Sequence, residues 1–131
     1  MINNIKYLFL ISMILVSSCD ESGTITGSDS VNEISNVSFS NVVTSITESS
    51  LVASGIIKNN SQSLSISPPW YIECQFYYQD NSGNTFLIGG ESVKINNALA
   101  SGISMEWTLT HQTDNPDNYS NFTINDLRAY K

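Results

Sequence analysis

From residue 34 to the end of the chain apolar and polar side chains alternate, and this period of two constrains the fold more than any other feature. The clearest run extends from residue 71 to residue 79, and its apolar face consists of Ile72, Cys74, Phe76 and Tyr78. Such alternation is typical of a strand with one face in the core and the other in water. Because no stretch has a helical period, the sequence predicts an all-β domain.

Turn residues divide this region into strands at spacings of about ten residues. The expected strands cover residues 34–46, 51–59, 71–79, 85–88, 91–95, a stretch around 103–109, and a last strand that includes Tyr119, Phe122 and Ile124. The first strand is expected to bend at Asn41-Val42-Val43, and Gly89-Gly90 to mark a bulge or a close approach. Six or seven strands of this kind predict an antiparallel β-sandwich.

A resemblance to a known family makes the fold more specific. The segment Ala53-Ser54-Gly55-Ile56-Ile57-Lys58-Asn59-Asn60-Ser61 resembles the opening of FxLYD-type domains, and residues 74–83 and 99–104 resemble later parts of that pattern. The match covers roughly residues 50 to 110 and departs from the pattern in lacking a proline before Gly102 and in its longer loop at 67–70. The resemblance implies an immunoglobulin-like sandwich that acts as an extracytoplasmic accessory or binding module.

The N-terminal segment has the organisation of an export signal. Lys6 precedes an apolar run of about ten residues, whereas a membrane-spanning helix needs roughly 20. The following Val16-Ser17-Ser18-Cys19 resembles the lipobox of bacterial lipoproteins. The resemblance implies that residues 1–18 are a signal peptide and that Cys19 carries diacylglycerol as a membrane anchor. Cleavage by an ordinary signal peptidase is the alternative, and it would leave Cys19 able to form a disulfide with Cys74.

The anchor would be followed by a spacer, so the predicted organisation is a signal peptide at 1–18, a lipidated cysteine with a flexible acidic tether at 19–33, and the sandwich at 34–131. Residues 20–33 are small, polar and acidic, without apolar periodicity. Acidic residues next to a lipidated cysteine resemble sorting signals, which direct lipoproteins to the outer membrane in some bacteria and retain them at the inner membrane in others. We expect the cell envelope, with the outer membrane favoured. Asp29-Ser30-Val31 also resembles an O-glycosylation acceptor, although an unmodified linker is the favoured interpretation.

Charge excludes one class of partner. The chain has 12 acidic and 5 basic residues, and removal of the leader with Lys6 leaves 12 against 4, a formal charge of −8. Nucleic-acid binding requires a basic patch or stripe, and the remaining basic residues are scattered. We therefore expect no nucleic-acid partner.

The residues that catalysis or a metal would require are few. His111 is the only histidine and is expected at the surface, and Cys74 is expected to be a small buried hydrophobe. Glu73, Glu91 and Glu106 are expected on solvated strand faces. The loop at 114–118 has oxygen ligands that suit calcium, but its Asx and Pro residues favour an ordinary turn. The sequence predicts a protein without catalytic residues, cofactor or metal.

Exposed aromatic side chains are the best candidates for binding. Trp70 and Tyr71 follow Pro68-Pro69, and Tyr77 is predicted on the same outward face as Tyr71. Together they would form a platform for a sugar ring or a partner protein, although packing at the sandwich rim is the favoured interpretation for Trp70. The sequence predicts a lipid-anchored binding or structural module of the cell envelope. The alternative is a surface glycan-binding lipoprotein that uses Trp70, Tyr71 and Tyr77.

Overall fold

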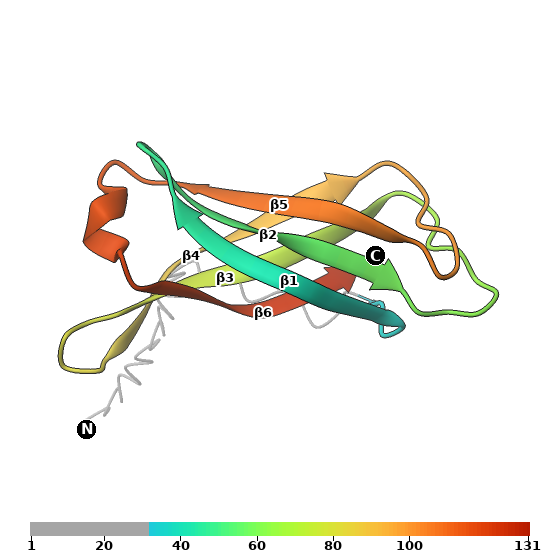
Figure 1. Ribbon diagram of the computed structural model, residues 1–131, viewed down its shortest axis with the longest axis horizontal. Coiled ribbons are helices and arrows are strands. Elements are labelled where there is room, and N and C mark those ends of the chain that lie inside the picture. The colour runs from blue at the N-terminus through green and yellow to red at the C-terminus, as the bar shows by residue number, and fades with distance from the viewer. Residues whose placement is uncertain (1–31) are drawn as a thin grey trace, which may run out of the picture.

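The computed structural model describes residues 32–131, which form a β-sandwich of six strands in two antiparallel three-stranded sheets (Figure 1). The strands are β1 (Val37–Ile46), β2 (Ser50–Asn59), β3 (Trp70–Gln79), β4 (Thr85–Ile95), β5 (Ser104–Gln112) and β6 (Phe122–Tyr130). One sheet has the order β1-β2-β5 and the other β4-β3-β6. The predicted all-β sandwich is confirmed. In this part of the chain no helix has the length and apolarity needed to cross a membrane.

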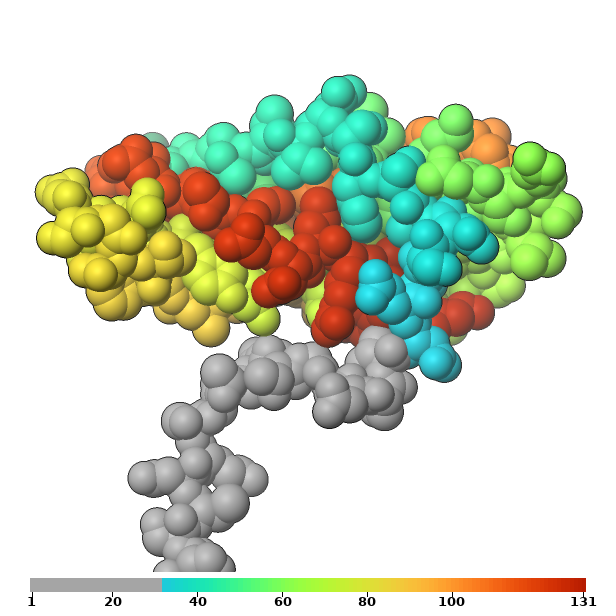
Figure 2. Space-filling model, turned by 90° about the horizontal axis from the view of Figure 1, so that it is seen from below, coloured from blue at the N-terminus to red at the C-terminus, as the bar shows by residue number. Residues whose placement is uncertain are grey.

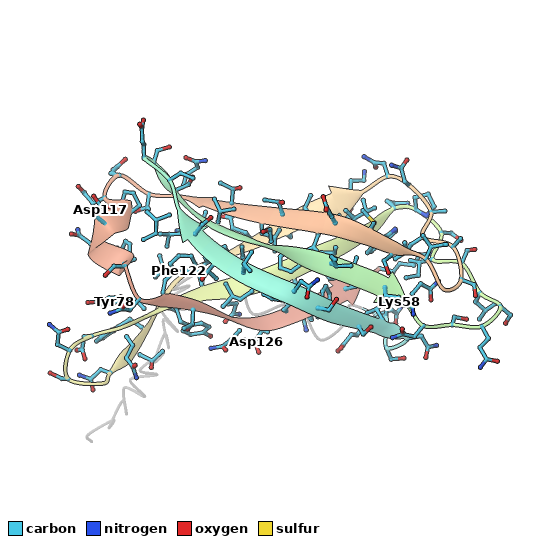
Figure 3. The ribbon with its side chains drawn as sticks, viewed as in Figure 1. Lys58, Tyr78, Asp117, Phe122 and Asp126 are labelled. Carbon is cyan, nitrogen blue, oxygen red and sulfur yellow. The ribbon has the colours of Figure 1, made fainter. Side chains whose placement is uncertain are left out.

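The connections give the sandwich two different ends. The connections at 47–49, 80–84 and 113–121 meet at one end, which we call the distal end. The loops at 60–69 and 96–103 lie at the opposite, proximal end. Figure 3 labels Asp117 and Tyr78 near the distal end and Lys58 near the proximal end.

The described chain enters at the proximal end, beside the last residues of β6. The backbone amide of Ile34 donates a hydrogen bond to the carbonyl oxygen of Ala129 at 2.9 Å. The backbone amide of Lys131 donates to the carbonyl oxygen of Asn32, also at 2.9 Å. Figure 2 shows β6 along the middle of the lower face, with the β3–β4 hairpin beyond it at the distal end. The first described residues therefore lie far from the distal end.

The core lies between the sheets, and alternation along the strands builds it as expected. The buried apolar side chains are Leu51, Ala53, Ile57, Ile66, Trp70, Ile72, Cys74, Phe76, Ile95, Leu99, Trp107, Leu109, Phe122 and Ala129. The predicted core faces of β2 and β3 are confirmed except at the end of β3, where Tyr78 is only half-buried. The faces form because successive strand residues point to opposite sides of a sheet.

Both predicted irregularities are present. The pairing of β1 with β2 shifts register between Ser40 and Val43, and Asn41 has a φ of 51°. In β4, Ile88 is the additional residue between the partners of Phe76 and Tyr77. However, residues 85–95 form one continuous strand because pairing with β3 continues on both sides of this bulge. The last strand begins at Phe122, because Tyr119 belongs to the 3₁₀ turn η1 (Pro116–Tyr119).

The Asn59-Asn60-Ser61 segment has a structural function. The Asn59 side chain is 1% exposed, and its amide nitrogen donates to the carbonyl oxygens of Leu64 at 2.8 Å and Leu99 at 3.0 Å. Its amide oxygen accepts a hydrogen bond from the backbone of Ser61 at 3.0 Å. Because a buried amide is costly unless it is hydrogen-bonded, this side chain holds the two proximal loops together.

Candidate functional site

The outward side of the β4-β3-β6 sheet brings together polar and aromatic side chains from all three strands. On β3 the outward residues include Tyr71, Glu73 and Tyr77, which alternate with the core residues. Antiparallel pairing places Tyr130 of β6 opposite Tyr71, and Arg128 of β6 and Ser92 of β4 opposite Glu73. We call this surface the outer face.

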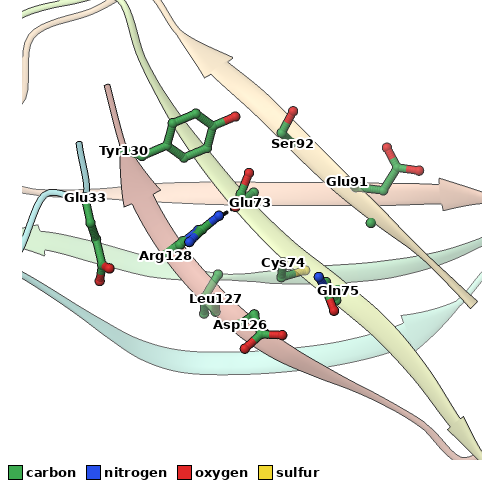
Figure 4. A pocket seen from close by; sticks show the side chains of 11 residues that line it. Glu33, Glu73, Cys74, Gln75, Glu91, Ser92, Asp126, Leu127, Arg128 and Tyr130 are labelled. Atoms are coloured by element: carbon green, nitrogen blue, oxygen red, sulfur yellow. Dashed lines mark hydrogen bonds and ion pairs between the residues drawn. The ribbon is translucent and has the colours of Figure 1, made fainter. Parts of the chain in front are cut away.

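A groove of about 550 Å³ lies on the outer face, and Figure 4 shows side chains from the three strands around it. Gly90 leaves room there: a Cβ at this position would meet nothing closer than the Cys74 carbonyl oxygen at 3.8 Å. On the other side, β6 has a register shift opposite β3 between Glu73 and Gln75, and Asp126 adopts a φ of 53°. The absent side chain on β4 and the bulge on β6 thus open the sheet surface.

The side chains around the groove are held by contacts with one another. The Arg128 guanidinium donates to the Glu73 carboxylate, and both side chains are partly exposed. The rings of Tyr71 and Tyr130 stack with centroids 5.1 Å apart and planes 15° apart. The Tyr77 hydroxyl donates a hydrogen bond to the Gln75 side-chain amide oxygen. Stacked aromatic pairs and ion pairs across neighbouring strands order a surface before any ligand arrives.

Tyr130 contributes a neutral hydroxyl to this surface. Partial burial raises the pKa of its phenol above the ordinary value, and the negative charge of Glu73 raises it further. The hydroxyl therefore remains protonated at neutral pH and can donate as well as accept a hydrogen bond.

Of the aromatic residues predicted for binding, Tyr71 and Tyr77 share the outer face and Trp70 does not. The Trp70 side chain is 0% exposed, and its indole N–H donates to the carbonyl oxygen of Asn97 at 3.0 Å. This position corrects the inclusion of Trp70 in an exposed platform and agrees with the packing interpretation. A signal was present in the sequence, because Trp70 has the parity of Ile72 and the other core residues of β3.

Several outer-face residues were not anticipated from sequence. They are Arg128, Tyr130, Ser92 and Asp126. These residues lie on β4 and β6, and the sequence does not show which residues of β3 they face. Their alternation was visible in the sequence, but their proximity to Glu73 and Tyr71 was not. The predicted lipidation residue Cys19, the signal peptide at 1–18 and the Asp29-Ser30-Val31 triplet lie outside the described residues.

A second polar contact joins the two sheets at the edges of β4 and β5. Nδ1 of His111 lies 2.9 Å from Oε1 of Glu91, and the His111 ring stacks on Phe76 with centroids 5.6 Å apart. The His111 side chain is only 19% exposed, so its expected surface position is wrong. Gly89 permits this arrangement, since a Cβ there would lie 2.5 Å from Cε1 of His111. Glu73 and Glu91 are thus paired, whereas Glu106 is exposed as expected.

The remaining candidates have structural positions. Cys74 is 1% exposed, and burial, with smaller contributions from the charges of Glu91 and Glu73, raises the pKa of its thiol to about 12. Its predicted role as a small buried hydrophobe is confirmed. The expected turn after β5 is present as η1. Within residues 32–131, no three His, Cys, Asp or Glu side chains are grouped so as to hold a metal ion.

Comparison with known proteins gives no relative for this chain: no family model, no curated protein and no solved structure matches it.

Proposed function

We propose that this protein is a non-catalytic binding module of the bacterial cell envelope, anchored by a lipid on Cys19 and binding through the outer face. The observation that carries the binding role is the groove of about 550 Å³ between ordered polar and aromatic side chains. Binding sites are concave surfaces in which a few oriented polar groups confer specificity. Here Glu73, Arg128 and Tyr130 supply such groups.

We propose no catalytic role because Cys74 is protonated and because Glu73 and Glu91 are both paired. A thiol whose pKa is raised to about 12 is almost entirely protonated at neutral pH, so Cys74 is a poor nucleophile. Glu73 is paired with Arg128, and Glu91 with His111. These groups stabilise strand pairing and contact between the sheets.

The anchor is supported by the sequence Val16-Ser17-Ser18-Cys19 and by the place at which the domain begins. Residues 20–31 separate Cys19 from the first described residue, and twelve residues can extend to at most about 40 Å. The domain would thus be held close to a bilayer by its proximal end.

A glycan is the second candidate, favoured by the mixture of hydrogen-bonding groups around the groove. Sugar hydroxyls both donate and accept, and the groove offers donors in Arg128 and Tyr130 and acceptors in Glu73 and Asp126. The adjacent Tyr71 and Tyr77 rings add apolar surface for a sugar.

The anchor is tested by the intact mass of the full chain extracted from bacterial membranes. We expect a chain that begins at residue 19 and carries the mass of acyl groups, and we expect Cys19→Ser to lose both that mass and the membrane association. An unlipidated wild-type chain would refute this part of the proposal.

The binding surface is tested by filling the groove. The Gly90→Tyr variant places a ring over the groove without a backbone clash, and the control Thr108→Tyr adds the same ring to the exposed outer side of the β1-β2-β5 sheet. On a glycan array we expect binding by the wild type and by Thr108→Tyr, and at least a tenfold loss in Gly90→Tyr, since such a ring displaces a ligand outright. A glycan signal that survives Gly90→Tyr would exclude the groove as the glycan site.

A further inference from the structure

The distal end has an apolar surface that the rest of the described chain leaves uncovered. Phe86 is 52% exposed, although it pairs with Tyr78 on the side of the sheet that carries the core residue Phe122. The Tyr78 ring meets that of Tyr119 edge-on, with centroids 5.6 Å apart. We call Phe86, Tyr78 and Tyr119 the distal patch. It lies where the β3–β4 hairpin extends to the distal end (Figures 1 and 3).

Acidic residues alone carry charge around this patch. The three distal connections contain Glu48, Asp80, Asp114 and Asp117, and they contain no lysine or arginine. The basic residues of the described chain all lie in the proximal half, namely Lys58, Lys94, Arg128 and Lys131. The distal end is therefore acidic without any basic residue, whereas the proximal half carries both signs of charge, and the exposed aromatic ring lies at the acidic end.

We infer that the distal patch is a docking surface for a protein segment in which an apolar side chain is flanked by lysine or arginine. Such a segment would cover Phe86 and place its cations near Asp114 and Asp117, so that both the apolar surface and the charge are complemented. A second copy of this chain would bring two acidic ends together, and a bilayer surface of anionic lipids would be repelled in the same way.

The position of the patch suits such a partner. The first described residues lie at the proximal end, so a lipid on Cys19 would attach the domain to the bilayer at the end opposite the distal patch and leave that patch accessible. The inference rests on the proposed function for this orientation only and is independent of the groove. Because the acidic side chains are exposed, their attraction to a basic partner should weaken as salt increases.

The test is photo-cross-linking of the full chain in intact bacteria. The photoreactive residue benzoylphenylalanine replaces Phe86, which is 52% exposed. In the matched control it replaces Ile103, a proximal residue that is 55% exposed. We expect one discrete heteromeric cross-link at position 86 and none at position 103.

The contribution of charge is tested in isolated membranes. The yield of the cross-link at position 86 should fall as salt is raised. It should also fall about fivefold when Asp114→Asn and Asp117→Asn are combined, since each exposed ion pair contributes little by itself. The charge control Glu106→Gln should leave the yield unchanged.

Each other result would overturn the inference. A cross-link to a second copy of this chain would identify self-association, and a cross-link to lipid would identify the bilayer. A basic partner at this end would be excluded by equal cross-linking yields at positions 86 and 103 or by the absence of any cross-link. It would also be excluded by a yield that responds neither to salt nor to the two aspartate substitutions. Failure of the groove is recognised separately by the Gly90→Tyr experiment, and failure of the anchor by the mass of the Cys19→Ser protein.

Discussion

The two tryptophans of the domain are both buried, but their indole nitrogens have different surroundings. Trp70 donates to the carbonyl oxygen of Asn97, whereas Nε1 of Trp107 has no hydrogen-bond partner among the described residues. Replacement by phenylalanine removes a satisfied donor in the first case and an unsatisfied one in the second. We expect Trp70→Phe to lower the free energy of unfolding by about 1 kcal/mol more than Trp107→Phe does.

Urea denaturation of the two variants measures this difference directly. Both substitutions delete a similar ring volume, so each variant serves as the other's packing control. Equal losses, or a larger loss for Trp107→Phe, would show that the hydrogen bond to Asn97 does not stabilise the fold.

Cys74 should make stability depend on pH in the alkaline range. Burial raises the pKa of its thiol from 9.0 to about 12 in the folded protein, so the unfolded chain loses its proton first. The stabilisation is therefore complete below pH 9 and is lost as pH rises toward about 12. We expect the unfolding free energy of the wild type to fall more steeply over this range than that of Cys74→Ala, in urea titrations at successive pH values. Parallel pH profiles would contradict the assignment to this thiol.

At the level of elements, the adjacent glycines of β4 have opposite surroundings. A Cβ at Gly89 would lie 2.5 Å from the His111 ring, which Phe76 and Glu91 hold in place, whereas a Cβ at Gly90 would make only ordinary van der Waals contacts at 3.8 Å or more. We expect Gly89→Ala to destabilise the fold by about 1–3 kcal/mol through overpacking, and Gly90→Ala to be neutral or slightly stabilising. Thermal unfolding of the two variants tests the contact between the β4 and β5 edges. Equal midpoints would mean that His111 moves aside freely.

Much of each strand was predictable because alternation is a local property. The faces of β2 and β3, the bend at Asn41 and the bulge beside Gly89 all follow from residue type and spacing within a few positions. The contact of Arg128 with Glu73 was not predictable in this way, since it depends on the bulge in β6 that sets its register against β3. The inclusion of Trp70 in the exposed platform has a different cause: the predicted strand begins at residue 71, one residue later than β3 does, which leaves Trp70 in the loop.

At the scale of the whole molecule, the arrangement of the two sheets determines what no single segment reveals. His111 is covered because the edges of β4 and β5 meet, and the groove exists because Gly90 and Asp126, 36 positions apart in the sequence, flank the same strand. The acidic distal end likewise depends on which connections share an end. Alternation and turn residues therefore predicted the sandwich and two of the outer-face aromatics, while the site's polar groups required the topology.

The stability of the whole domain should come from its core without help from a disulfide. Within residues 32–131 Cys74 is a free, buried thiol. We expect the midpoint of thermal unfolding of the full chain to be the same with and without a thiol reductant. If Cys19 were unlipidated and bonded to Cys74, reduction would remove about 2–4 kcal/mol of stabilisation and lower the midpoint by roughly 10 °C or more. Such a drop would contradict both the buried thiol and the lipid anchor, because one sulfur atom of Cys19 cannot serve a thioether and a disulfide.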